Sequence, residues 1–132
     1  MQTFLPYPEF DKSAAVLDRK RLGKQRVEAY QILRAIEEGN GWGNHPIVKM
    51  WTGFENALKL YSNAMVKEWI RRGYQNSLEI YDLGGYSIVY PWWIGIEELH
   101  SSHRAALLAK DYEFYSKYGW DETPGVKYRW YV

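Results

Sequence analysis

The chain has 132 residues, with 17 basic and 16 acidic side chains, seven tryptophans, twelve tyrosines and no cysteine. This length suits one domain with a proper hydrophobic core. The balanced charge excludes a surface that attracts nucleic acid everywhere, and the lack of cysteine excludes disulfides, thiolate zinc sites and a cysteine nucleophile. Residues 1–8 contain no basic n-region and no long apolar run, so we expect no signal peptide, no membrane contact and a cytoplasmic protein associated with the nucleoid.

The N-terminal third predicts an extended start followed by one long helix. Pro6 and Pro8 exclude a helix in the first eleven residues. Ser13 is the expected N-cap of a helix that runs to about Glu38 and is ended by Gly39-Asn40-Gly41.

Two further helical segments are expected in the middle of the chain. His45-Pro46 opens the first of them, because proline suits the first turn of a helix. After Gly53, apolar residues recur at spacings of three and four, which predicts a long amphipathic helix that Gly73 ends. These residues are Phe54, Leu58, Tyr61, Met65 and Trp69.

The C-terminal part begins with loop and turn over residues 76–95, in which residues 86–90 are a candidate short strand. A third helix is expected over about 96–110 and a short one over about 112–118. Residues 123–132 predict an aromatic arm packed on the domain. The sequence therefore predicts a compact, all-α single domain over residues 1–132.

Within the stretch from Leu17 to Glu28, residues 19–26 carry five basic side chains and no acid, and the carboxylate of Glu28 follows them. At 100° per residue, Arg21, Lys24 and Glu28 fall in one narrow sector, flanked by Gln25 and Gln31. The apolar stripe lies elsewhere on the helix and comprises Leu22, Ala29, Leu33 and Ile36. Cations keep a carboxylate ionised and can hold a polyanion such as DNA over it. The same spacing is equally typical of a solvated helix with i,i+4 ion pairs.

Arg19 and Arg26 project into the apolar arc of this helix. Each either extends over the edge of the core or packs, buried, against a partner. Gly23, in the middle of the helix, permits a slight bend or the close approach of another element.

Three histidines are candidates for binding. His45 lies in a turn before a helix, where it can reach a groove. His100 and His103 are three residues apart, but no third metal ligand is evident nearby, so we predict neither metal nor cofactor. His103 shares a helix face with apolar residues and can instead be a hydrogen-bonded core residue. Arg104 and Lys110 form a second, smaller basic site.

Trp92 and Trp93 follow a proline-led turn just before the third helix. Aromatic rings in such a place can stack on a base that has left the duplex, and core packing is the alternative for one of the pair. The serines lack an Asp–His partner pattern, and the chain has no phosphate loop or dinucleotide fingerprint.

Several motifs resemble the pyrimidine-dimer DNA glycosylases of the endonuclease V type. The pattern Leu17-x4-Leu22-x5-Glu28 follows a short extended N-terminus, as in that family. The helix end Glu68-Trp-Ile-Arg-Arg-Gly-Tyr74 and the aromatic arm Lys127-Tyr-Arg-Trp-Tyr131 are also similar to that family. A bacterial and phage branch is similar in further motifs, namely Met1-Gln-Thr-Phe-Leu-Pro-Tyr-Pro, Arg21-Leu-Gly-Lys-Gln-Arg-Val-Glu, Trp42-x-Asn44-His45-Pro46 and His100-x-x-His103-Arg104.

The resemblance implies an all-α, monomeric enzyme that acts on double-stranded DNA containing a damaged or modified pyrimidine. In that family the N-terminal α-amine, here that of Met1, attacks C1′, releases the base and forms an imine. Glu28 occupies the place of the catalytic carboxylate that assists ring opening and β-elimination. The expected DNA contacts are Arg21, Lys24, Gln25, Arg26, His45, Trp92, Trp93, His100, His103 and Arg104.

Two positions differ from the family pattern. Gln2 is bulky where the family has a small residue, and Gln31 takes the place of a basic residue one turn after the carboxylate. Two alternatives therefore stay open. One is a glycosylase for another modified pyrimidine, in which Glu28 activates water without a lyase step. The other is a non-catalytic DNA-binding module on the same scaffold.

Overall fold

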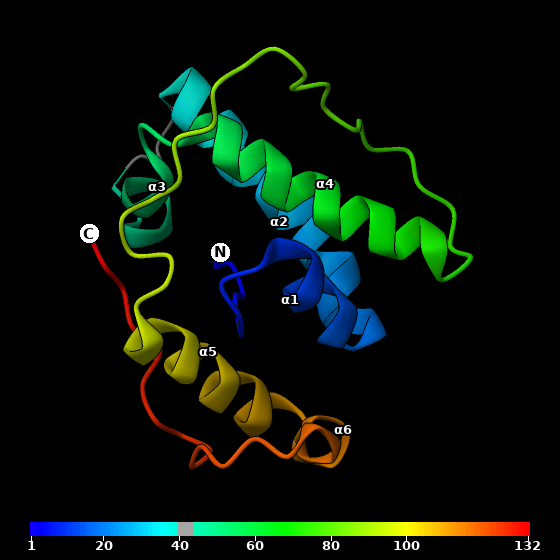
Figure 1. Cartoon of the computed structure of the whole chain (residues 1–132), viewed down its shortest axis with the longest axis vertical. Coiled ribbons are helices and arrows are strands. Elements are labelled where there is room, and N and C mark those ends of the chain that lie inside the picture. The colour runs from blue at the N-terminus through cyan, green and yellow to red at the C-terminus, as the bar shows by residue number, and fades with distance from the viewer. Residues whose placement is uncertain (40–43) are drawn as a thin grey trace.

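The computed structural model describes residues 1–39 and 44–132, and every regular element in these ranges is a helix. The elements are α1 (Phe10–Val16), α2 (Arg19–Glu38), α3 (Pro46–Trp51), α4 (Glu55–Arg71), α5 (Glu97–Lys110), α6 (Tyr112–Tyr115) and the 3-10 helix η1 (Ser116–Tyr118). Helices α2 and α4 pack together, and α1 packs on α4. Figure 1 shows α5 on the other side of the N-terminal segment from α4. The connection between them, residues 72–96, is extended and returns along α4 to reach α5. The all-α prediction is confirmed.

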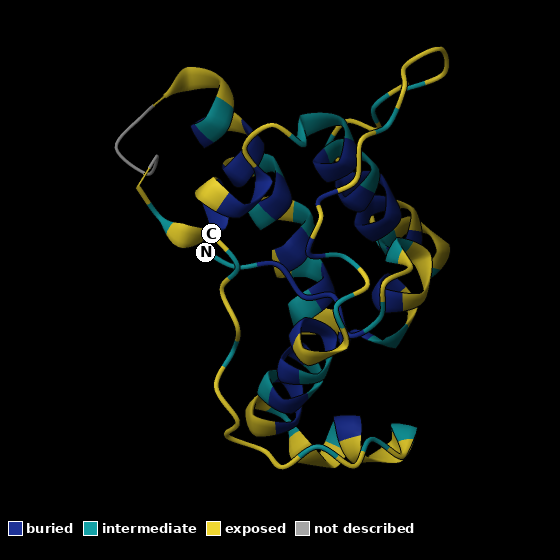
Figure 2. Ribbon diagram, turned by 60° about the vertical axis from the view of Figure 1, so that its left-hand side comes forward, coloured by how far each residue is buried: buried dark blue, intermediate teal, exposed yellow. Residues whose placement is uncertain are grey.

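The core lies between the inner faces of these helices. Leu22, Ala29 and Leu33 of the predicted stripe are buried on α2, and large aromatic side chains fill the centre. Trp51, Tyr61, Trp93 and Tyr115 are fully buried. Figure 2 shows that the buried residues also include the chain just after the N-terminus, which runs between the helices rather than over them.

The single helix expected from Ser13 to Glu38 is wrong, because the structure has two helices separated at Leu17 and Asp18. Leu17 has an extended backbone, with ψ of 140°. Ser13 lies inside α1 instead of capping it, and its hydroxyl accepts a hydrogen bond from Tyr7 N (3.1 Å). The helix also begins at Phe10, so the extended start is shorter than expected.

The break is stabilised by residues that are distant in the sequence. Asp18 N donates to Tyr115 Oη at 3.0 Å, and Asp18 Oδ1 accepts a hydrogen bond from the same hydroxyl. Arg72, at the end of α4, donates to Leu17 O at 2.8 Å and Ala15 O at 3.2 Å. These bonds satisfy carbonyl groups that the end of α1 leaves without helical partners.

Most other boundaries agree with the sequence. Gly39 has φ of 62° and ends α2, whereas Asn40 and Gly41 lie outside the described residues. Pro46 begins α3, and Gly73 follows α4 with φ of 93°. Residues 86–90 form no strand, so that expectation is wrong.

Candidate active site

Glu28 lies half-buried on α2, on the side that faces the chain start. Its Oε2 accepts a hydrogen bond from Gln25 Nε2 at 2.7 Å. Burial raises the pKa of the Glu28 carboxyl, and the positive charges of the N-terminal amine, Lys24 and Lys110 partly oppose this rise. Met1 itself is partly buried against the core. The fold therefore brings the chain start, α2 and α5 together around one carboxylate.

Glu28 borders two hollows that share Lys20 and Lys24 as lining residues. The larger is a shallow cavity of about 920 Å³, lined by Asp18, Arg19, Lys20, Gly23, Lys24, Arg26, Val27, Glu28, Trp69 and Phe114. The smaller is about 120 Å³ and is lined by Gln2, Phe4, Lys20, Arg21, Lys24, Gln25, Glu28 and Lys110. The smaller hollow thus combines four cations with a single carboxylate, which suits it to an anionic ligand.

The basic residues of α2 are not equivalent. Arg21 forms an ion pair with Asp18 at 3.3 Å. Arg26 donates to Asn76 Oδ1 at 2.9 Å and lies over the Trp69 ring, 4.8 Å from its centroid. Of the two possibilities for Arg26, the structure therefore shows packing against a partner.

The lysines of the site differ from these arginines. Within residues 1–39 and 44–132, no ion pair includes a lysine, and Lys20, Lys24 and Lys110 are exposed. Lys110 belongs to α5 and joins this site only through the fold. Its basic character was evident in the sequence, but nothing local indicated that it lies beside Glu28.

At Gly23 the Trp69 side chain of α4 lies close to the backbone of α2. A Cβ atom at this position would lie 3.1 Å from the ring of Trp69. The close approach that the sequence allowed is therefore confirmed. It lets Trp69 form one wall of the larger cavity.

The N-terminal segment, residues 2–7, is held by side chains rather than by a helix or sheet. Phe4 N donates to Tyr61 Oη at 2.9 Å, and Tyr128 Oη donates to Thr3 O at 2.5 Å. Thr3 Oγ1 also accepts a hydrogen bond from the indole of Trp51 at 3.3 Å. Buried backbone groups need such partners, so these bonds fix the path of the segment.

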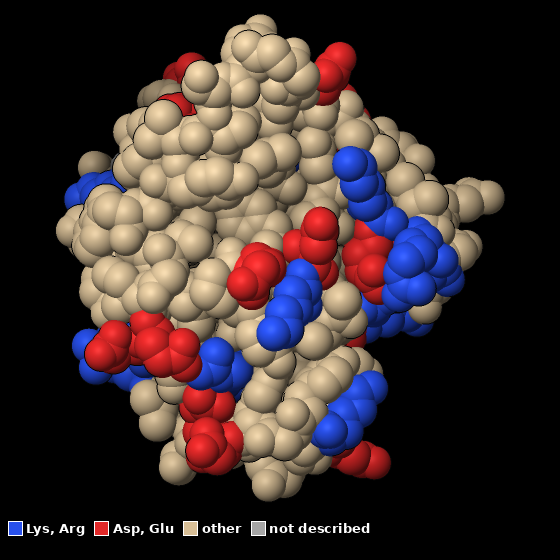
Figure 3. All heavy atoms as spheres, viewed as in Figure 1, with Lys and Arg blue, Asp and Glu red and all other residues tan. Residues whose placement is uncertain are grey.

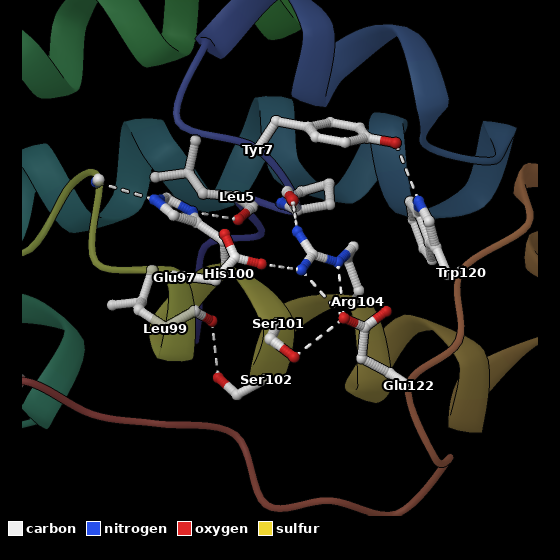
Figure 4. Close-up of polar contacts among 12 residues, drawn as sticks. Leu5, Tyr7, Glu97, Leu99, His100, Ser101, Ser102, Arg104, Trp120 and Glu122 are labelled. Atoms are coloured by element: carbon white, nitrogen blue, oxygen red, sulfur yellow. Dashed lines mark hydrogen bonds and ion pairs between the residues drawn. The ribbon is translucent and has the colours of Figure 1, made fainter.

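His100 and His103 are two of these partners (Figure 4 labels His100). Leu5 N donates to His103 Nδ1 at 2.9 Å. His100 Nε2 accepts from Gly95 N at 2.9 Å, so its Nδ1 carries the proton and donates to Leu5 O at 2.8 Å. Burial lowers the pKa of both histidines, which agrees with neutral rings that accept hydrogen bonds. Both rings are 0% exposed, so neither is available to DNA in this structure.

Arg104 also faces inward rather than toward a ligand, as Figure 4 shows. It donates to Pro6 O at 2.7 Å and to Glu122 Oε2 at 3.0 Å, and it pairs with Glu97. Arg104 and Lys110 therefore do not form the second basic site that was expected. Arg104 holds the N-terminal segment, and Lys110 lies beside Glu28.

Trp92 and Trp93, both expected to contact DNA, have different environments. Trp93 is 0% exposed and donates from Nε1 to Met50 O at 3.1 Å, so it belongs to the core. Trp92 is 60% exposed, and its ring meets that of Tyr131 edge-on at 5.7 Å. The alternative of core packing for one of the pair is confirmed for Trp93.

His45 caps α3 by accepting a hydrogen bond from Ile47 N at 3.1 Å, and its ring lies edge-on to Trp130 at 5.8 Å. Burial, followed by the charge of the N-terminal amine, lowers the pKa of this imidazole. The amine therefore acts on both His45 and Glu28. Trp42, in the same motif, lies outside the described residues.

The described residues contain no group of three or more His, Asp and Glu side chains placed to hold a metal ion. None of the helices among them is long and apolar enough to cross a bilayer. The absence of a metal and of a cofactor stays a prediction.

A family model described as pyrimidine dimer DNA glycosylase matches residues 1–82. The matched part contains the N-terminal segment, Gln25 and Glu28, and it ends before α5. No curated protein and no solved structure matches the chain. Because the family model covers more than half of the 132 residues, and the part that carries Glu28, the chain belongs to the pyrimidine dimer DNA glycosylase family.

Proposed function

We propose that this protein removes a damaged or modified pyrimidine from double-stranded DNA, with the Met1 amine as nucleophile and Glu28 as the acid–base group. The observation that carries the proposal is that Glu28 is half-buried within the electrostatic reach of the N-terminal amine. Burial raises the pKa of Glu28, and the charge of the amine lowers it in part. A pKa above the usual carboxyl range favours a side chain that both donates and accepts a proton in one reaction. Family membership supports the glycosylase step.

In the proposed reaction the neutral amine attacks C1′, and the bond from C1′ to the base breaks. The electron pair leaves with the base, and the proton that the attacking nitrogen loses neutralises the departing base. The sugar ring then opens between C1′ and O4′ as the imine forms, and Glu28 delivers a proton to O4′. The resulting carboxylate removes a proton from C2′, and the 3′ phosphate leaves, so the strand is nicked.

The lysines beside Glu28 would hold the phosphates that flank the lesion. Lys20, Lys24 and Lys110 are exposed and line the smaller hollow. The larger cavity, with Trp69 and Phe114 among its walls, offers space for a nucleotide that has left the duplex. Trp92 is the exposed indole of the 92–93 pair and is the one we propose as a stacking surface.

Replacing Glu28 by Gln tests the proposal. This change keeps the shape of the side chain and removes its charge. Strand cleavage of UV-irradiated duplex should fall at least about 100-fold, whereas binding should stay equal or become tighter because repulsion with phosphate is lost. Glu37→Gln, an exposed change on the same helix, is the control and should cleave normally. Cleavage by Glu28→Gln within about tenfold of wild type contradicts the assignment.

Borohydride reduction during turnover tests the nucleophile. An adduct mapped to Met1 supports the amine, and an adduct on Lys20 or Lys24 moves the nucleophile into α2. Base release without any adduct favours the second candidate, a glycosylase in which Glu28 activates water. Tight binding without base loss across a panel of damaged and modified duplexes indicates a DNA-binding module.

A further inference from the structure

Gln25 is a fully buried polar side chain, 1% exposed, one turn before Glu28 on α2. Its Nε2 donates to Gln2 O at 2.9 Å and to Glu28 Oε2 at 2.7 Å. Its Oε1 accepts from Tyr61 Oη at 2.6 Å and from Phe4 N at 3.3 Å. One amide therefore uses both donors and both acceptor positions, and three of its four partners lie on the N-terminal segment or on Glu28.

The polarity of these partners fixes the orientation of the amide. If Oε1 and Nε2 were exchanged, an acceptor would face the Gln2 carbonyl and the Glu28 carboxylate, and a donor would face Phe4 N–H. The donor side is thus directed at the site and the acceptor side at the core. Asn is the other residue type with this amide group, and its side chain is one methylene shorter.

We propose that Gln25 is a positioning residue that holds the N-terminal segment and Glu28 in one fixed arrangement. The proposal rests on the proposed function of Glu28 and the Met1 amine. Gln2 is the residue next to Met1, so the bond to Gln2 O fixes the Gln2–Thr3 peptide group, one residue after the amine. The bond to Glu28 Oε2 fixes the carboxylate by the same NH₂ group. The separation of the amine and the carboxylate is therefore set through one side chain.

The arrangement also assigns different tasks to the two oxygens of Glu28. Oε2 is held by Gln25, whereas Oε1 has no hydrogen bond to a described residue. Oε1 is thus the oxygen left to exchange a proton with the substrate. The charged groups that act on this carboxyl are the N-terminal amine, Lys24 on the same helix and Lys110 on α5. Gln25 adds a neutral donor, and a donor to a carboxylate favours the ionised form.

Gln25→Glu tests the donor side of the amide separately from the acceptor side. It keeps an acceptor for Tyr61 and Phe4 and removes only the donors to Gln2 and Glu28. At pH 7 to 8 the new carboxylate also repels Glu28, so kcat for base release should fall about 30-fold, with KM for the duplex changed less than about threefold. Activity should recover partly toward lower pH, because a protonated carboxyl at this position can again donate to Glu28. Gln25→Leu, which cannot donate at any pH, should lose kcat without that recovery.

Ser13→Ala is the matched control. Ser13 is also buried and also holds the N-terminal segment, but through Tyr7, which lies five residues beyond Gln2. It should lower the melting temperature and leave kcat and the pH profile unchanged. If both Gln25 variants lose activity only in proportion to their unfolded fraction, with the pH profile of Ser13→Ala, Gln25 is a core residue and the proposal is overturned.

A measurement without turnover separates failure of this proposal from failure of the proposed function. Wild-type protein that releases no base from any duplex contradicts the proposed function. The Glu28 titration, followed by carboxyl ¹³C NMR, then still tests Gln25. A Glu28 pKa that rises in Gln25→Leu, together with faster amide exchange at Phe4, supports the coupling. An unchanged titration overturns it. If Gln25→Leu does not fold, Gln25→Met replaces it, because Met is close to Gln in length, cannot donate and adds no charge beside Glu28.

Discussion

Lys24 is an exposed side chain one turn before Glu28, and its charge lowers the pKa of that carboxyl. We predict that Lys24→Gln raises the Glu28 pKa, because a cation that favours the ionised form is removed. Activity that needs the carboxylate is then lost at a higher pH on acidification, so the acid limb of the pH–rate profile moves upward. The dependence of DNA affinity on salt should weaken by about one phosphate contact.

The control for this change is Lys67→Gln, an exposed lysine on α4 that lines neither hollow beside Glu28. It should change neither the pH profile nor the salt dependence. An acid limb and a salt slope that stay unchanged in Lys24→Gln show that Lys24 is only a solvated side chain.

Trp92 and Trp93 are neighbours with opposite environments, so the same substitution should affect them differently. Trp93→Leu removes a buried indole and its hydrogen bond to Met50 O, and should destabilise the protein by about 3 kcal/mol or more. Trp92→Leu should leave the melting temperature almost unchanged and weaken specific DNA binding by about 1–3 kcal/mol. Thermal melts and titrations with lesion duplex measure the two effects. Normal DNA affinity in Trp92→Leu would remove it from the binding surface.

Residues that act within one helix could be predicted, and those that act across the fold could not. The sector of Arg21, Lys24 and Glu28 follows from helical spacing alone. The sequence placed His100 and His103 on a helix with a binding role open for both, and with a core role open for His103 alone. Their partner is the backbone of Leu5, 95 or more residues earlier, and no local pattern indicates that contact.

At the scale of the helices, Arg72 joins the end of α4 to the end of α1. We predict that Arg72→Lys lowers the free energy of unfolding, measured by urea titration, by about 1–3 kcal/mol. One ammonium cannot reach Glu68 and the carbonyls of α1 together. Arg71 also bonds to Glu68, but its side chain is 70% exposed. Arg71→Lys is therefore the control and should cost less stability than Arg72→Lys. Equal losses in the two variants would show that Arg72 does not support the break.

The helices themselves were predictable where the apolar spacing is continuous. The boundaries of α4 and α5 agree with the sequence because spacing and glycine signals are local. The break between α1 and α2 was not predicted because Leu17 and Asp18 are neither glycine nor proline, so the local sequence gives no signal that a helix ends there. Their extended backbone is stabilised by Tyr115 and Arg72, which come from other parts of the chain.

At the scale of the whole molecule, charge is mixed rather than concentrated. Figure 3 shows acidic and basic side chains side by side on the lower part of one face, with a largely uncharged upper part. The net charge of +1 agrees with this view. Local clusters of basic residues are therefore needed to attract DNA, as the composition indicated, and the proposed function assigns this task to the lysines around Glu28.

The C-terminal arm, residues 123–132, closes over the N-terminal segment. Tyr128 stacks on His103 with ring centroids 4.1 Å apart and bonds to Thr3 O. We predict that deletion of the arm lowers the melting temperature and speeds amide exchange at Phe4 and Leu5, because their cover is lost. Hydrogen-exchange mass spectrometry measures this effect. Protection that stays equal to that of the full chain would show that the helices alone hold the segment.

The threaded N-terminal segment has a consequence for how the protein is made. Leu5 bonds to a residue 98 positions later, and Thr3 to one 125 positions later. A ribosome releases the N-terminal segment long before it has synthesised these partners, so the segment waits unpaired until translation is almost complete. An affinity tag fused ahead of Met1 would also convert the α-amine that the proposed function requires into an amide. A recombinant version is therefore best tagged after Val132.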